Sequence, residues 1–117
     1  MKSILVENSK EFAIHIVDIC KVIRDERREQ TIVKQLLRSG TSIGANVHEA
    51  NYASSRQDFS NKLQIALKEC YETEYWLEIF FKTEYLREEE YKRLLAECNK
   101  IRKMLTASIK TVKASIE

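Results

Sequence analysis

Residues 36–51 read LLRSGTSIGANVHEAN, and this stretch holds both glycines of the 117-residue chain, Gly40 and Gly44. Around them the apolar residues recur at steps of three and four, which is typical of an α-helix that packs along one face. A glycine inside a helix costs about 1 kcal/mol relative to alanine. Because the two glycines lie four residues apart, they share one face of that helix. We therefore expect this face to let another backbone approach closely.

The remainder of the chain has the composition of a helical protein. It contains no proline and only the two glycines, which argues against a β-rich fold with many turns. Apolar residues recur at helical spacing in four segments, which predicts four helices. The first is expected to begin after Ser9, as its N-cap, and to end near Asp25. The second is expected to run from about Glu29 to Tyr52.

Capping signals locate the start of the other two helices. Ser55 is a suitable N-cap residue, and Asp58 follows it three positions later, as in a weak capping box. The fourth helix is expected to start near Arg87, because the three glutamates that follow suit the positive end of a helix dipole. The connections are short, so consecutive helices should be antiparallel neighbours. The sequence therefore predicts an all-α fold: an up-down-up-down antiparallel four-helix bundle, forming a single domain over residues 1–117.

The segment 70–81 is apolar on more than one side of its predicted helix. Trp76 and Phe80 fall within the expected core arc, whereas Tyr75 and Ile79 fall outside it. A helix that is apolar on two sides is buried on two sides. We interpret the second side as a subunit interface; a broadly buried monomeric core and a binding groove are the alternatives. The residues expected at the interface or in close helix packing are Gly40, Gly44, Tyr71, Tyr75, Trp76, Ile79 and Phe80.

A polar stripe runs beside the apolar stripe of the second predicted helix. Its members, Ser39, Ser42, Asn46 and Glu49, step by three, four and three residues. Serine and asparagine are poor helix formers, because their side chains compete for backbone hydrogen bonds. Their presence inside a helix indicates a polar network that fixes packing and specificity. A contact with a ligand or with nucleic acid is the alternative.

Charge is distributed unevenly along the second half of the chain. Residues 69–99 contain nine acidic and four basic residues, whereas residues 100–117 contain five basic residues and one acidic residue. Charge runs usually mark solvated helix faces or complementary neighbouring helices. The sharper interpretation is a basic surface that contacts nucleic-acid phosphates. The candidate residues are Lys100, Arg102, Lys103, Lys110 and Lys113 in the fourth helix, and Arg24, Arg27 and Arg28 near the first turn.

The sequence offers no catalytic, cofactor-binding or metal-binding residue. Its two histidines, His15 and His48, lack the Glu-x-x-His spacing of di-iron bundles, and the serines lack a plausible His and Asp set. Cys20, Cys70 and Cys98 fit no zinc spacing, and each falls on an apolar stripe. We expect reduced core cysteines in a cytoplasmic protein. No segment approaches the roughly 20 apolar residues needed to span a membrane.

Several stretches of the chain resemble a known family. They are LRSGTSIGANVHE at 37–49, SSRQDF at 54–59, Leu63, IAL at 65–67, ETE at 72–74 and YL at 85–86. They resemble the four-helix-bundle family first noticed in intervening sequences of bacterial 23S rRNA genes, whose members are sometimes labelled ribosomal proteins. The accessory proteins of diversity-generating retroelements look like relatives. The family usually has Glu-Gly where this chain has Glu49-Ala50, so Ala50 is expected to extend the second helix slightly.

The resemblance implies a left-handed four-helix bundle, a ring of five subunits, and a link to structured RNA or to a reverse transcriptase. It implies no catalytic residues. We therefore expect a non-enzymatic homo-oligomer that binds nucleic acid, most simply RNA, through its basic helical surface. A structural module that assembles a protein partner without contacting nucleic acid is the alternative. Salt dependence separates the two, because phosphate binding weakens steeply as salt rises.

Overall fold

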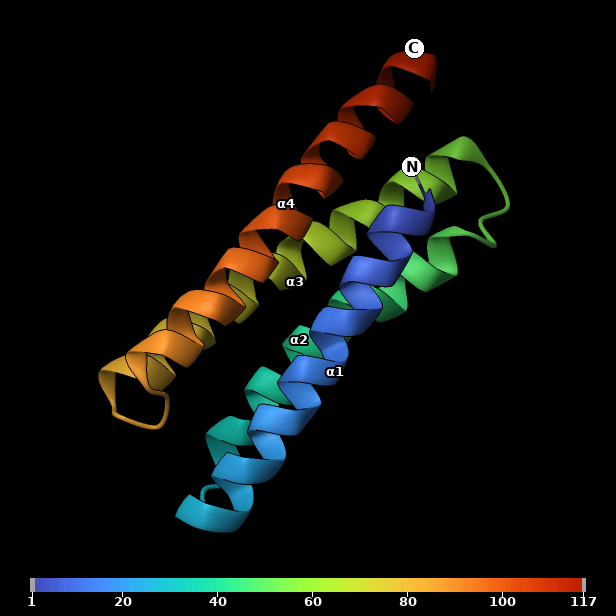
Figure 1. The fold of residues 1–117 in the computed structure, drawn as a ribbon. Helices are drawn as coiled ribbons and strands as arrows, with labels where there is room; N and C mark the ends of the chain where they lie inside the picture. The colour runs from blue at the N-terminus through green and yellow to red at the C-terminus, as the bar shows by residue number, and fades with distance from the viewer. Residues whose placement is uncertain (1, 117) are drawn as a thin grey trace.

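The computed structural model describes residues 2–116, and side chains from residue 4 onward. It consists of four helices joined by short connections: α1 (Lys2–Arg27), α2 (Thr31–Ala50), α3 (Arg56–Lys82) and α4 (Glu88–Ile116). Consecutive helices run antiparallel (Figure 1). Each helix packs on the next, and α4 packs back on α1, in a body of 49 × 21 × 20 Å. The predicted all-α antiparallel four-helix bundle is confirmed.

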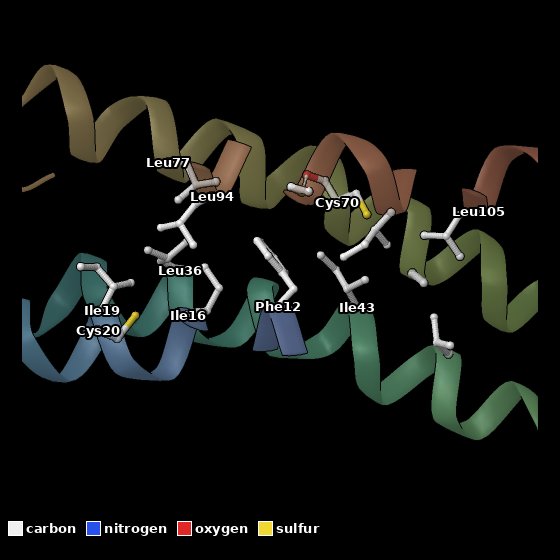
Figure 2. Packing of buried hydrophobic residues seen from close by; sticks show 14 of the residues in the cluster. Phe12, Ile16, Ile19, Cys20, Leu36, Ile43, Cys70, Leu77, Leu94 and Leu105 are labelled. Atoms are coloured by element: carbon white, nitrogen blue, oxygen red, sulfur yellow. Dashed lines mark hydrogen bonds between the residues drawn. The ribbon is translucent and has the colours of Figure 1, made fainter. Parts of the chain in front are cut away.

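The apolar stripes of all four helices meet in one core. Figure 2 shows Phe12 and Ile16 of α1 pointing toward side chains from the other helices, among them Leu36, Leu77 and Leu94. These five side chains are 0–1% exposed. Fully burying an aliphatic or aromatic side chain stabilises a protein by about 1.5–3 kcal/mol. The core therefore accounts for the fold without a disulfide, and the three cysteines are free and buried.

The two glycines of α2 lie where α1 crosses closest to it. A Cβ added to Gly40 would lie 2.9 Å from both Cγ atoms of Ile16, and one added to Gly44 would lie 3.0 Å from the backbone oxygen of Ser9. Real Cβ atoms rarely approach other atoms this closely, so a Cβ at either position would force Ile16 or the α1 backbone to shift. The close approach expected from the sequence is present, and the approaching backbone is α1 of the same chain. Gly40 and Gly44 therefore lie in helix packing within the bundle.

Helix α1 begins earlier than the sequence indicated. The predicted N-cap, Ser9, lies inside the helix, and its hydroxyl donates to the backbone oxygen of Val6 at 3.2 Å. Leu5 is buried and continues the apolar stripe toward the N-terminus. Ser9 is 1% exposed, and its backbone oxygen faces Gly44 of α2. The serine serves packing, and the N-cap prediction is wrong.

The ends of the other helices are close to their predicted positions. Ser55 caps α3 by accepting from the backbone N–H of Asp58 at 3.0 Å, as the capping box predicted. Helix α2 is shorter than expected. Glu29 stays outside it and accepts from the backbone N–H of Ile32 at 3.0 Å, and the helix ends at Ala50 itself. Helix α4 starts at Glu88, one residue from the predicted start.

Enlarging Gly44 should destabilise the bundle. Gly44→Leu forces the new side chain against the backbone of α1, and overpacking of this kind costs about 1–3 kcal/mol. The neighbouring Ala45 is exposed on the same helix, so Ala45→Leu is a matched control that should leave stability nearly unchanged. Urea unfolding measures both variants. A midpoint that rises for Gly44→Leu would show that α1 does not contact this face.

Candidate nucleic-acid interface and self-association surfaces

Three lysines of α4 form a basic strip that we call the lysine face: Lys103, Lys110 and Lys113. All three are exposed, and none makes an ion pair or hydrogen bond to any residue that the structure describes. Their spacings of seven and three residues place them along one side of the helix. Unpaired lysines on one side of a helix can contact successive phosphates, which positions a nucleic acid without reading its sequence.

Arg102 is separate from the lysine face, because it joins α4 to α3. Its Nε donates to Glu74 at 3.0 Å, and its guanidinium lies 5.8 Å from the centre of the Tyr71 ring. The hydrogen bond from Arg102 to the Glu74 carboxylate raises the pKa of the guanidinium above its ordinary value. The charge of Arg102 is thus matched within the bundle, and it is a weaker phosphate ligand than the lysines.

Lys100 lies one turn before Lys103 on α4 and is also exposed. It lines a hollow of about 180 Å³ between α1 and α4, together with His15 and Glu97. The Nδ1 atom of His15 lies 2.8 Å from a carboxylate oxygen of Glu97, which ties the two helices together. The sequence did not reveal this pair, because its members are 82 residues apart and neither belongs to a motif.

The arginines near the first turn do not join the lysine face. Arg24 pairs with its neighbour Asp25 at 2.9 Å. Arg27 donates to the backbone oxygen of Glu84 at 2.8 Å and lies over the Tyr85 ring, so it fastens the end of α1 to the α3–α4 connection. This end of the bundle is opposite the C-terminus of α4 (Figure 1). Arg28 is exposed there, in the left-handed conformation with φ of 54°.

The polar stripe of α2 follows the seam between α2 and α3. The Thr73 hydroxyl donates to the Ser39 hydroxyl at 3.0 Å, and both side chains are fully buried. The Asn46 amide donates to the backbone oxygen of Ser42 at 2.9 Å, within α2. Glu49 accepts from Lys62 of α3 at 3.1 Å. These contacts are internal to the chain, and they favour packing over contact with a ligand.

The aromatic segment of α3 divides into core and surface residues. Phe80 is fully buried, so the structure places it in the core of one chain and not at a surface. Trp76 and Ile79 are half-buried, and the indole N–H of Trp76 donates to Glu72 at 3.1 Å. Tyr71 and Tyr75 remain 54% and 57% exposed. These two tyrosines, one turn apart, form what we call the tyrosine ridge.

A second surface feature was not evident from the sequence. An apolar hollow of about 240 Å³ lies between α1 and α2, and we call it the α1–α2 groove. Its walls are formed by Val17, Cys20, Val33 and Leu37. Helical periodicity places Cys20, Val33 and Leu37 on the apolar stripes of their helices. Only the pairing of α1 with α2 shows that these residues also line a hollow.

The described part of the chain shows no candidate metal site. No group of three or more His, Cys, Asp or Glu among them could hold a metal ion. Burial raises the pKa of the Cys20 thiol to about 12. A thiol with that pKa is almost wholly protonated at neutral pH and is a poor nucleophile. Within residues 2–116 no helix is long and apolar enough to cross a membrane.

Fold and surface together define a class: a small all-α bundle that presents a lysine face, a tyrosine ridge and an apolar groove. The chain belongs to the 23S rRNA-intervening sequence protein family, whose model matches residues 1–107. It is 50% identical to a crystal structure of a protein from Bacteroides thetaiotaomicron, described as of unknown function and from the S23 ribosomal protein family. The match has a TM-score of 0.91 and covers 94% of this chain and 99% of that one. No curated protein matches the chain.

The ion pairs of Arg38 should make stability depend on pH in the acid range. Arg38 of α2 binds Glu69 and Glu72 of α3 and lowers the pKa of Glu72 from its ordinary 4.5. A carboxylate whose pKa is lowered by folding stabilises the protein above its unfolded pKa, and this contribution disappears as pH falls through the folded value. Arg38→Gln should therefore unfold more easily than the wild type at pH 7, and the difference should shrink below pH 4.5.

The ion pairs of Arg38 with Glu69 and Glu72 are partly exposed. The loss of unfolding free energy in Arg38→Gln at pH 7 should therefore be no more than about 1 kcal/mol. Urea unfolding at pH 7 and pH 3 measures it. Arg28→Gln is the matched control, because Arg28 is exposed and has no ion-pair partner among the described residues. An Arg38→Gln difference of the same size at both pH values would show that the ion pairs do not cause it.

Proposed function

We propose that this protein is a non-enzymatic, self-associating bundle of the cytoplasm that binds structured RNA through the lysine face of α4. The observation that carries the proposal is that three exposed lysines without a described partner lie along one side of a single helix, α4. Arg24, Arg27 and Arg102 are engaged within the chain, whereas Lys103, Lys110 and Lys113 are exposed without a described partner. A lysine that binds a phosphate releases a counterion from the nucleic acid, and this release favours binding most strongly at low salt.

The family also supports an RNA partner. Its description refers to intervening sequences of 23S rRNA, and the similar Bacteroides protein is assigned to a ribosomal protein family. Both descriptions name ribosomal RNA or the ribosome, and this link supports RNA as the partner proposed here. A basic strip without base-reading side chains suits binding that follows the shape and charge of a folded RNA.

Self-association would multiply the contribution of each lysine face. One face offers three cations, which is a small footprint for an RNA-binding surface. Several copies in one assembly present several faces, and binding through more than one of them raises the overall affinity without any new contact. The exposed tyrosine ridge supports this part of the proposal, because aromatic residues are enriched in protein interfaces. The family resemblance suggests a ring of five subunits.

A protein scaffold is the second candidate function. The tyrosine ridge and the α1–α2 groove are apolar surfaces that could hold a protein partner, such as a reverse transcriptase. Binding of that kind would depend weakly on salt, because it buries apolar area. Steep salt dependence supports RNA binding, and weak salt dependence with a protein partner supports the scaffold.

Neutralising the lysine face should weaken RNA binding. The variant Lys103→Gln/Lys110→Gln/Lys113→Gln should bind a structured RNA less tightly, by a similar factor for unrelated sequences. The slope of log affinity against log salt should fall by roughly one for each lost contact, or about three at most. Glutamine is a good helix former, so the fold should be unchanged. Fluorescence anisotropy between 50 and 200 mM salt gives both quantities.

The control carries the same change in net charge at other sites. Lys10, Lys82 and Lys92 are exposed on α1, α3 and α4, and replacing all three with Gln should leave RNA affinity close to that of the wild type. Equal losses of RNA affinity in both variants would show that net charge alone, and not the lysine face, determines binding. Unchanged RNA affinity in the lysine-face variant, with loss of the oligomer, would instead assign these lysines to subunit contacts.

A further inference from the structure

The α1–α2 groove has an apolar floor and a positively charged rim. Val17 and Leu37 both line it, and the basic residues around it are Lys21, Lys34 and Arg24, of which Arg24 is paired with Asp25. Lys21 and Lys34 are exposed and form no ion pair with any described residue. A hollow lined by aliphatic side chains favours an apolar group, and its rim favours negative charge beside that group. The groove therefore suits an apolar side chain flanked by carboxylates.

The tyrosine ridge of α3 has these properties. Tyr75 is 57% exposed, and carboxylates lie on both sides of it along the helix at Glu72, Glu74 and Glu78. Glu72 and Glu74 are paired with arginines of neighbouring helices. The side chain of Glu78 is 52% exposed, and its described partner is Lys82 on the same helix, at 3.5 Å. Exposed pairs of this type contribute little, so Glu78 is available to an external cation.

We propose that the tyrosine ridge of one copy docks into the α1–α2 groove of a second copy. Tyr75 enters the apolar hollow, and Glu78 meets the rim lysines Lys21 and Lys34. Tyrosine is among the residues that contribute most to protein interfaces, since it buries a large ring and keeps its hydroxyl at the wet edge. Complementary charge at the rim fixes the register of the contact. The inference rests on the self-association in the proposed function and names its two surfaces.

The two surfaces lie on different sides of the bundle. The groove belongs to α1 and α2, whereas the ridge is exposed on α3, which is not an adjacent neighbour of α1 in the bundle. The contact is therefore heterologous: each copy offers one ridge and one groove. Such contacts close into a ring or extend as a filament. A two-fold dimer would instead place ridge against ridge or groove against groove, and would oppose like charges.

The experiment disables each surface in a separate variant. Lys21→Glu/Lys34→Glu reverses the rim of the groove and leaves the ridge intact. Tyr71→Ser/Tyr75→Ser removes the ridge and leaves the groove intact. All four side chains are exposed, so both variants should keep the helical circular dichroism and the unfolding midpoint of the wild type. Light scattering after size exclusion should give a mass near 13.8 kDa for each variant alone, and several times this mass for the wild type.

Mixing the two variants tests the heterologous geometry directly. One variant retains a ridge and the other a groove, so together they can form one contact and no more. We expect a one-to-one complex of about twice 13.8 kDa that does not grow further. Lys10→Glu/Lys92→Glu is the charge-matched control, because these lysines lie outside both surfaces, and it should assemble like the wild type.

Each other outcome overturns a distinct claim. A wild-type protein that scatters as a monomer overturns the self-association in the proposed function, and this inference with it. A wild-type oligomer whose mass survives both variants overturns the ridge-and-groove contact and leaves self-association standing. If both variants are folded monomers but form no complex when mixed, the tyrosine ridge does not bind the α1–α2 groove, and the proposed contact is wrong. RNA affinity of the monomeric variants is read separately and does not bear on the contact.

Discussion

The close contact between α1 and α2 is the constraint on which the rest of the bundle depends. Gly44 lies against the backbone of α1 at Ser9, and Gly40 lies against the side chain of Ile16. A helix interior with two glycines loses about 2 kcal/mol of helix propensity relative to alanine. The close contact of α1 with α2 compensates for this loss, because it fixes the distance and register of the two helices. It also places Ile16 and Phe12 in the core, where they meet α3 and α4.

That contact also determines what lies on the surface. Beside the contact of Gly40 with Ile16, the paired helices α1 and α2 leave the α1–α2 groove. On the opposite side, α3 is fixed by the buried Ser39–Thr73 pair and by Arg38, and its outer side bears the tyrosines. The α1–α2 groove and the tyrosine ridge, which we propose to meet between copies, thus both result from the packing of helices within one chain.

The sequence predicted the features that depend on neighbouring residues. Helix periodicity, the Ser55 capping box and the close-approach role of the glycines are all local patterns, and the structure has each of them. The start of α1 was missed because Ser9 has the chemistry of a cap, and only its position against Gly44 shows otherwise. The sequence also did not predict that Phe80 is buried and Tyr75 is exposed. Both are aromatic, and only the pairing of the helices determines which side chain is covered. For the same reason the sequence grouped Arg102 with lysines that the structure separates from it.

The C-terminal turn of α4 lies beyond the core. Ile109 is the last residue of the helix that is buried, and residues 113–116 are all exposed. A helix end with few buried contacts opens at a lower free energy than the core, so its amide protons should exchange before those of the core. Lys113 lies on this exposed turn, whose Ser115 carbonyl accepts from Arg56 at 3.4 Å, and Lys110 lies just before it. An RNA ligand would have to order this turn on binding, which lowers the affinity but allows the lysines to follow phosphates whose spacing differs from one RNA fold to another.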